Sequence, residues 1–109
     1  SEIYACTAYG LWKSNNAGNN WAKIDFKKKK VGYNFVRSFF IHPTYPTLHF
    51  VGTAEGLLIS KKIPNTWRVI PAITSEVYNI IYNPRQLSQI FCATENGIYL
   101  SNNYGANWQ

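Results

Sequence analysis

One eight-residue frame occurs three times in this 109-residue chain. Each copy starts with Ser and ends with Trp seven residues later, at residues 14–21, 60–67 and 101–108. A Thr and a Gly precede every copy at constant spacing, so the shared landmarks are Thr7, Gly10, Ser14 and Trp21; Thr53, Gly56, Ser60 and Trp67; and Thr94, Gly97, Ser101 and Trp108. Self-similarity with a period of roughly 40 residues predicts a repeat architecture.

Each landmark in the frame has a local physical role. Ser and Asn side chains bond to nearby backbone amides, and Gly18 and Gly105 can take the positive φ that a tight turn requires. The frame therefore predicts a hairpin turn. The Trp that closes it is a large apolar anchor, and truncating such a side chain costs about 3–5 kcal/mol where it is buried.

The sequence between the frames predicts short β-strands, because β-branched and aromatic residues alternate with Gly, Pro and Asn. We expect strands at residues 3–7, 11–14, 21–26, 35–42, 48–53, 56–60, 67–70, 77–82, 89–94 and 97–101. This gives four strands per repeat, as in the blade of a β-propeller. Residues 27–34 form a polar connection that is five residues longer than its counterpart in the next repeat.

The frame resembles the Asp-box, or bacterial neuraminidase repeat, of sialidases and sortilin-like proteins, whose pattern is S-x-D-x-G-x-T-W. Here Asn16, Lys62 and Asn103 stand at the Asp position, which removes any cation site there, and only Thr66 keeps the Thr. Pro64 stands at the Gly position of the middle copy and cannot take positive φ, so that turn must be built differently. The resemblance implies an all-β fold, a partial β-propeller of about two and a half four-stranded antiparallel blades.

The strand order predicts a division into a partial blade with a Lys-rich loop (1–34), a full blade (35–75) and a second partial blade (76–109). Propellers close with four to eight blades, so we do not expect this chain to close a ring alone. Further blades are expected from the same longer chain or from neighbouring chains.

Positive charge is concentrated in one part of the chain. The net charge is +6, and six of the eleven basic residues lie between Lys13 and Lys30. Lys23, Lys27, Lys28, Lys29 and Lys30 form a basic patch that would attract anions. No aromatic interleaving or nucleic-acid motif accompanies it, so we expect a solvated loop and no nucleic-acid partner. No apolar run approaches 18 residues and no leader pattern occurs, so we expect neither a membrane span nor a signal peptide.

The cysteines and histidines do not predict a metal or cofactor site. Aligned on the repeat landmarks, Cys6 and Cys92 lie one register apart and should face opposite sides of their strands, so we expect two buried free thiols and no disulfide. His42 and His49 flank one turn, where we expect them to pack or to form hydrogen bonds. Two Cys and two His at scattered positions have no metal-ligand spacing.

A candidate ligand face follows from the blade topology. Enzymes that resemble this family, such as sialidases and xyloglucan-cleaving hydrolases, bind sugar at the end of the propeller opposite the Asp-boxes. In this chain that end would carry Tyr9, Tyr33, Arg37, Glu55, Glu76, Tyr78 and Glu95. Aromatic side chains stack on sugars and also dominate protein interfaces. Most strand aromatics, including Phe39, Phe40 and Trp67, are expected in the core between blades.

The resemblance favours a non-catalytic interaction module that binds protein or glycan partners as a segment of a larger protein or assembly, in an extracellular or surface location. We assign no catalytic residue. Arg37, Arg68 and Arg85 cannot converge as the three arginines of a sialidase do, and Glu55 and Glu95 are expected to be solvated turn carboxylates. The alternative is a fragment of a sialidase-like or xyloglucanase-like glycoside hydrolase, in which two carboxylates would flank the scissile bond.

Overall fold

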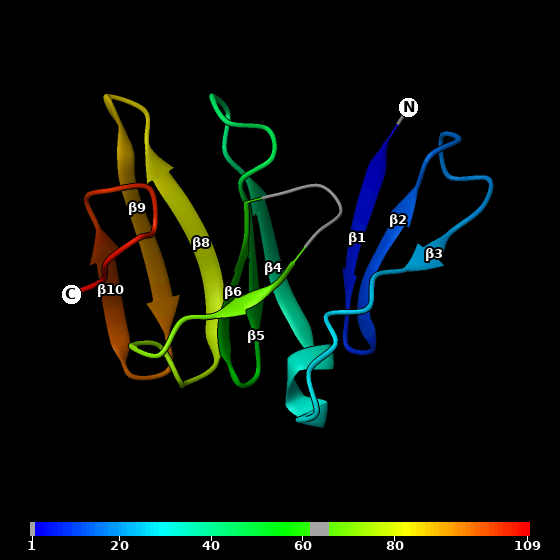
Figure 1. The fold of residues 1–109 in the computed structure, drawn as a ribbon, viewed down its shortest axis with the longest axis horizontal. Coiled ribbons are helices and arrows are strands. Elements are labelled where there is room, and N and C mark those ends of the chain that lie inside the picture. The colour runs from blue at the N-terminus through cyan, green and yellow to red at the C-terminus, as the bar shows by residue number, and fades with distance from the viewer. Residues whose placement is uncertain (1, 62–65) are drawn as a thin grey trace.

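The chain forms three antiparallel sheets that stand side by side (Figure 1), in a computed structural model that describes residues 2–61 and 66–109. The first sheet contains β1 (Ile3–Thr7), β2 (Gly10–Ser14) and β3 (Ala22–Lys23). The second contains β4 (Val36–Ile41), β5 (His49–Thr53), β6 (Gly56–Ser60) and β7 (Arg68–Val69). The third contains β8 (Val77–Asn83), β9 (Gln86–Thr94) and β10 (Gly97–Ser101).

All ten predicted strands are present, and their bounds differ in a few places. The strands that leave the frames, β3 and β7, are only two residues long. The pairing continues for one more backbone bond in each case, from Ile24 to β2 and from Ile70 to β6. After β10, Leu100 and Gln109 exchange both of their backbone N–H···O bonds, as the first pair of a further strand would. The polar connection contains a short 3₁₀ helix, η1 (Val31–Asn34), directly before β4.

The Thr and Gly landmarks fix the turn between the second and third strands of each repeat. Thr53 Oγ1 donates to the carbonyl oxygen of Gly56 at 2.8 Å and accepts the backbone N–H of Glu55 at 3.1 Å. Thr7 and Thr94 form the same pair of bonds in their own turns. One hydroxyl therefore satisfies two backbone groups at each of these hairpins, which explains the constant Thr-to-Gly spacing.

The middle sheet separates two hydrophobic clusters. Every residue of β5 and β6 is buried. Phe50 and Leu57 face the third sheet, whereas their neighbours Val51 and Leu58 face the first sheet, because successive side chains of a strand point to opposite faces. Trp67 joins the cluster toward the first sheet, as predicted, and is 4% exposed. Phe39 and Phe40 pack against opposite clusters, which confirms their placement between sheets.

Both histidines are buried and hydrogen-bonded, as expected. His42 Nε2 lies 2.7 Å from the carbonyl oxygen of Leu87 and thereby links the second sheet to the third. Its Nδ1 accepts the backbone N–H groups of Thr44 and Tyr45, at 3.1 Å and 3.3 Å. These bonds require the tautomer that carries its proton on Nε2.

Among the described residues, the His49 side chain forms one hydrogen bond, from Nε2 to the carbonyl oxygen of Pro46 at 3.0 Å. Its Nδ1 is buried and has no hydrogen-bond partner among the described residues. Burial lowers the pKa of the His49 imidazole below its ordinary value of 6.5, while the bond to Pro46 opposes this shift. His49 is therefore neutral in the folded protein at neutral pH.

Among the described residues, no helix is both long and apolar enough to cross a membrane.

We predict that His49 makes folding pH-dependent on the acid side of neutrality. Above about pH 6.5, the ordinary pKa of histidine, its neutral form contributes fully to stability. As the pH falls below this value, the unfolded chain gains a proton that folded His49 resists, so the free energy of unfolding decreases. His49→Gln keeps an amide donor for Pro46 and cannot titrate. The stability difference between wild type and His49→Gln, measured by urea denaturation, should shrink from about pH 7.5 to about pH 5; parallel pH profiles would contradict this.

Candidate functional site

The candidate ligand residues lie near one end of the sheets, which carries the β1–β2, β5–β6 and β9–β10 turns and η1 (the lower end in Figure 1). Tyr9, Glu55 and Glu95 occupy those three turns. Arg37 is the second residue of β4, and Glu76 and Tyr78 flank the first residue of β8. Tyr33, from η1, packs against the cluster that faces the first sheet and is only partly exposed.

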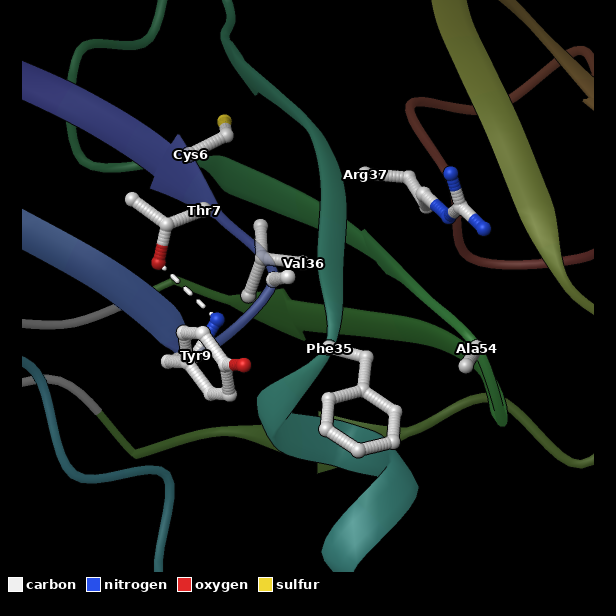
Figure 2. Close-up of a pocket in the computed structure, with 8 residues that line it drawn as sticks. Cys6, Thr7, Tyr9, Phe35, Val36, Arg37 and Ala54 are labelled. Atoms are coloured by element: carbon white, nitrogen blue, oxygen red, sulfur yellow. Dashed lines mark hydrogen bonds between the residues drawn. The ribbon is translucent and has the colours of Figure 1, made fainter.

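A groove of about 570 Å³ opens between the first and second sheets at this end (Figure 2). Its lining comes from the end of β1, the β1–β2 turn, Phe35 with the start of β4, and Ala54 of the β5–β6 turn. Tyr9 and Phe35 are the exposed large hydrophobic residues at the groove, with 75% and 41% of their surface accessible. The Thr7 hydroxyl accepts the backbone N–H of Tyr9 at 3.0 Å and so fixes the backbone that carries this ring.

Sequence reasoning predicted two of the groove residues, Tyr9 and Arg37, and missed Phe35. The expected strand at residues 35–42 placed Phe35 among the strand aromatics, whereas the structure puts it just before β4, as the residue that ends η1. Its backbone is fixed by bonds to Gly32 and Ala54. The length of the 27–34 connection was the one signal that pointed to this place, since the additional residues form η1 and set the position of Phe35.

Two ion pairs join the candidate residues across elements. Arg37 Nε lies 2.5 Å from Glu76 Oε2, which links the second sheet to the third beside the groove. Lys30 Nζ lies 3.7 Å from Glu55 Oε1, between the basic patch and the β5–β6 turn. Three of the four side chains are more than a third exposed, so water and salt screen these pairs. Arg37 and Glu55 thus carry compensated charges at this end of the sheets.

The expectation of two buried free thiols was half wrong. Cys92 is buried in the cluster between the second and third sheets, where desolvation raises the pKa of its thiol to about 12. Cys6 is exposed and borders the groove. Desolvation still raises the pKa of the Cys6 thiol above its usual value, so neither cysteine is activated as a nucleophile.

The first and third frames form turns with the same hydrogen bonds; we call them the first box turn (14–21) and the third box turn (101–108). In the third, Ser101 Oγ accepts the N–H of Gly105 at 2.8 Å, and Asn103 Oδ1 accepts the N–H of Asn107 at 2.9 Å. Trp108 Nε1 donates to the carbonyl oxygen of Gly105 at 2.9 Å. Ser14, Asn16 and Trp21 repeat each of these bonds in the first box turn.

The two box turns differ in what lies over them. Gly105 is buried with φ +91°, and a Cβ at this position would lie 2.7 Å from Cε2 of Phe50. The third box turn therefore packs closely on the second sheet. Gly18 has φ +93° and more space, with Trp21 and Ile3 as its nearest neighbours. Trp21 is 41% exposed, in contrast to buried Trp67 of the middle frame. Lys62 and Pro64 of that middle frame lie outside the described residues.

The described residues contain no cluster of three or more His, Cys, Asp or Glu side chains that would hold a metal ion. The three arginines lie on different elements: Arg37 on β4, Arg68 on β7 and Arg85 in the β8–β9 turn. The β8–β9 turn lies at the opposite end of the sheets from the start of β4 (Figure 1).

No protein-family model and no curated protein matches the sequence. Among solved structures, the chain is similar to the crystal structure of an ancestral GH74 enzyme, with a TM-score of 0.83 and 23% sequence identity. The match covers 99% of this chain and 16% of that enzyme chain. GH74 enzymes are β-propellers. The chain is therefore an all-β partial β-propeller of antiparallel blades, as the strand pattern predicted. Among the described residues, the middle sheet has all four strands of a blade and the outer two sheets have three each.

We predict that removing the Ser101 hydroxyl destabilises the protein more than removing the Ser14 hydroxyl. Ser101→Ala leaves the N–H of Gly105 buried without an acceptor, which should lower the free energy of unfolding by about 1–3 kcal/mol. The equivalent bond in the first box turn is only partly buried, so water can replace it in Ser14→Ala. Urea denaturation of both variants tests this, and equal losses would contradict it.

Proposed function

We propose that this chain is a non-catalytic segment of a β-propeller that binds a protein or glycan partner through the groove between its first two sheets. The observation that carries the proposal is the pair of exposed rings, Tyr9 and Phe35, at a groove of about 570 Å³. Aromatic side chains held on a rigid backbone give contact area at low entropic cost, on sugars and on proteins alike. Propeller enzymes that this chain resembles use the corresponding end for sugar.

The two box turns support the resemblance to the Asp-box. In both, an Asn oxygen accepts the backbone N–H that closes the turn, at the position where the family pattern has Asp. The family's Thr position is also Asn, and the two amides bond to each other at 2.8 Å in both turns. Asn16 with Asn20, and Asn103 with Asn107, thus act as coupled pairs. We infer that they substitute for the Asp and Thr of the family pattern.

We propose that further blades are partners of this chain, and that 1–34, 35–75 and 76–109 are its blade boundaries. The third sheet exposes Ile81 and Ile98, and the first sheet exposes Ile3 and Trp21. In the middle sheet, by contrast, apolar side chains are buried on both faces. Blades from the same longer chain or from neighbouring chains would cover the exposed residues of the outer sheets. The resemblance also supports an extracellular or surface location.

The second candidate is a segment of a glycoside hydrolase, and the similarity to the GH74 enzyme favours it. Glu55 and Glu95 lie on equivalent turns of successive sheets, at the end where such enzymes bind sugar. Glu55 is paired with Lys30, an arrangement that suits a structural carboxylate. We therefore prefer the non-catalytic proposal.

The groove proposal predicts that truncating its two rings weakens partner binding. Tyr9→Ala with Phe35→Ala should lower binding at least about tenfold, since each aromatic contact contributes about 1 kcal/mol or more. Tyr45→Ala is the matched control, because Tyr45 is 48% exposed and lies in the β4–β5 connection, at the other end of the sheets. Glycan arrays and cross-linking of bound proteins measure the effect. Full binding by the double variant would overturn the proposal.

The same preference predicts that the turn carboxylates are dispensable for catalysis. Glu55→Gln and Glu95→Gln should leave any glycan hydrolysis by the complete protein unchanged, because neither residue would act as general acid, base or nucleophile. Hydrolysis is followed by release of reducing sugar from xyloglucan and of free sialic acid from a sialoside. Loss of turnover in either variant, with unchanged folding, would establish the hydrolase candidate instead.

A further inference from the structure

We propose that the first and third box turns each bind a small neutral saccharide ring, in a crevice formed by the Trp and the Asn side chains of the turn. These crevices lie away from the groove, so the inference does not rest on the proposed function. It assigns a second kind of site to a motif whose hydrogen bonds would otherwise serve only the fold.

The two crevices occupy the same place in two repeats. The first, of about 260 Å³, is lined by Lys13, Asn15, Asn16, Asn20, Trp21 and Ala22. The third, of about 300 Å³, is lined by Leu100, Asn102, Asn103, Asn107, Trp108 and Gln109. Each thus combines one indole with three Asn side chains at equivalent positions. Two independent copies of one local shape and one local chemistry indicate a property of the turn itself.

The indole is fixed before any ligand arrives. Trp21 Nε1 donates to the carbonyl oxygen of Gly18 at 3.0 Å, and Trp108 Nε1 donates to that of Gly105 at 2.9 Å. Both ring systems therefore have a set orientation, and their polar edge is already satisfied. What remains for a ligand is the part of the apolar ring surface that is not packed, which suits the C–H face of a pyranose: Trp21 is 41% exposed, and Trp108 is partly buried against the cluster between the second and third sheets. A fixed ring costs little entropy on binding.

The amide groups beside the indole offer unused donors. Asn16 Nδ2 donates to Asn20 Oδ1, and Asn103 Nδ2 donates to Asn107 Oδ1, both at 2.8 Å, which fixes the orientation of each pair. The Nδ2 groups of Asn20 and Asn107 have no hydrogen-bond partner within residues 2–61 and 66–109. Each therefore presents two N–H donors beside the ring, which match the oxygen atoms of sugar hydroxyls.

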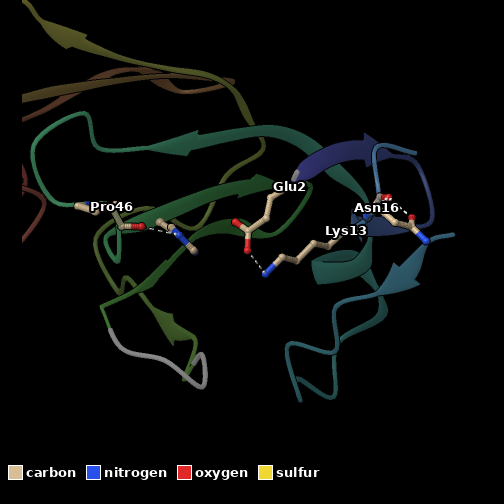
Figure 3. A network of polar contacts seen from close by, with 6 residues as sticks. Glu2, Lys13, Asn16 and Pro46 are labelled. Carbon is tan, nitrogen blue, oxygen red and sulfur yellow. Dashed lines mark hydrogen bonds and ion pairs between the residues drawn. The ribbon is translucent and has the colours of Figure 1, made fainter. Parts of the chain in front are cut away.

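Charge and size narrow the ligand to one neutral ring. No charged side chain lines the third crevice, within the described part of the chain. The one lysine at the first crevice, Lys13, is paired with Glu2 at 3.1 Å (Figure 3), so it does not supply an uncompensated charge for an anion. Both volumes lie near the lower limit of ligand pockets, which fits one sugar ring. We expect millimolar affinity per crevice, raised where two crevices engage one branched or polymeric glycan.

The middle repeat provides an internal comparison. A crevice of about 240 Å³ occupies the equivalent place, and its described lining is Ile59, Lys61, Thr66 and Arg68. Trp67 is buried in the core and is absent from that lining. Its described part offers two cationic side chains instead of an indole face, so we expect no saccharide binding there.

The test follows the four indole N–H signals of the protein by NMR. The probes are methyl β-glucoside, methyl β-galactoside and N-acetylglucosamine, and glycerol serves as a hydroxyl-rich control without a ring face. The indole signals of Trp21 and Trp108 should shift with at least one sugar, saturating in the millimolar range. The signals of Trp12 and Trp67 should not. No shift of the Trp21 and Trp108 signals with any sugar, or equal shifts with glycerol, would overturn the proposal.

A conservative variant separates binding from folding. Asn20→Asp keeps the oxygen that accepts from Asn16 and removes the free amide donors, so the turn persists while sugar binding at Trp21 weakens by about three- to tenfold. Asn79→Asp is the matched control: it adds the same charge on β8 and keeps the oxygen that accepts the N–H of Ile80. Unchanged binding in Asn20→Asp would overturn the assigned role of the amide.

The two proposals fail independently. Substitution of Tyr9 and Phe35 should leave the sugar-induced shifts of Trp21 and Trp108 unchanged. Asn20→Asp should likewise leave partner binding at the groove unchanged. Loss of the indole shifts in the groove variants would contradict two separate sites.

Discussion

The structure depends on burial of both faces of the middle sheet. Strands β5 and β6 contribute Phe50 and Leu57 to one cluster and Val51 and Leu58 to the other. A sheet with no solvated face is stable only where another layer covers each side. The first and third sheets supply those layers, and the ion pair between Arg37 and Glu76 and the bond from His42 to Leu87 add polar links across the second boundary.

Hydrogen-bonded turns at both ends fix how the strands within each sheet pair. At one end a Thr hydroxyl closes each β-hairpin, and at the other a Ser hydroxyl and an Asn amide organise the two described box turns. Exposed rings are mounted on these fixed backbones: Tyr9 beside the groove and Trp21 beside a crevice. These turns give the chain two separate surfaces suited to recognition, the groove and the box-turn crevices, while the strands form the hydrophobic clusters.

The repeat landmarks predicted the strand order because each has a local cause. A Thr two residues before a backbone N–H, or a Ser four residues before a Gly, forms its bonds within the turn itself. Properties that depend on neighbouring sheets were beyond the sequence. The exposure of Trp21 depends on what lies over its position, whereas the burial of its counterpart Trp67 was predicted, and Cys6 is exposed beside a groove that no local pattern encodes. The hydrogen bond between Asn16 and Asn20 was not predicted, although both positions of the pair depart from the family pattern in two repeats.

The unequal coverage of the three sheets sets an order of unfolding. Each outer sheet shares one interface with the middle sheet, whereas the middle sheet shares two, so removing an outer sheet breaks a single interface and leaves the remaining pair associated. Stability in such arrays is a sum of unit terms and nearest-neighbour terms. In the 109 residues studied without further blades, amide protons in β5 and β6 should therefore exchange with solvent last, and the outer sheets should unfold before the middle sheet.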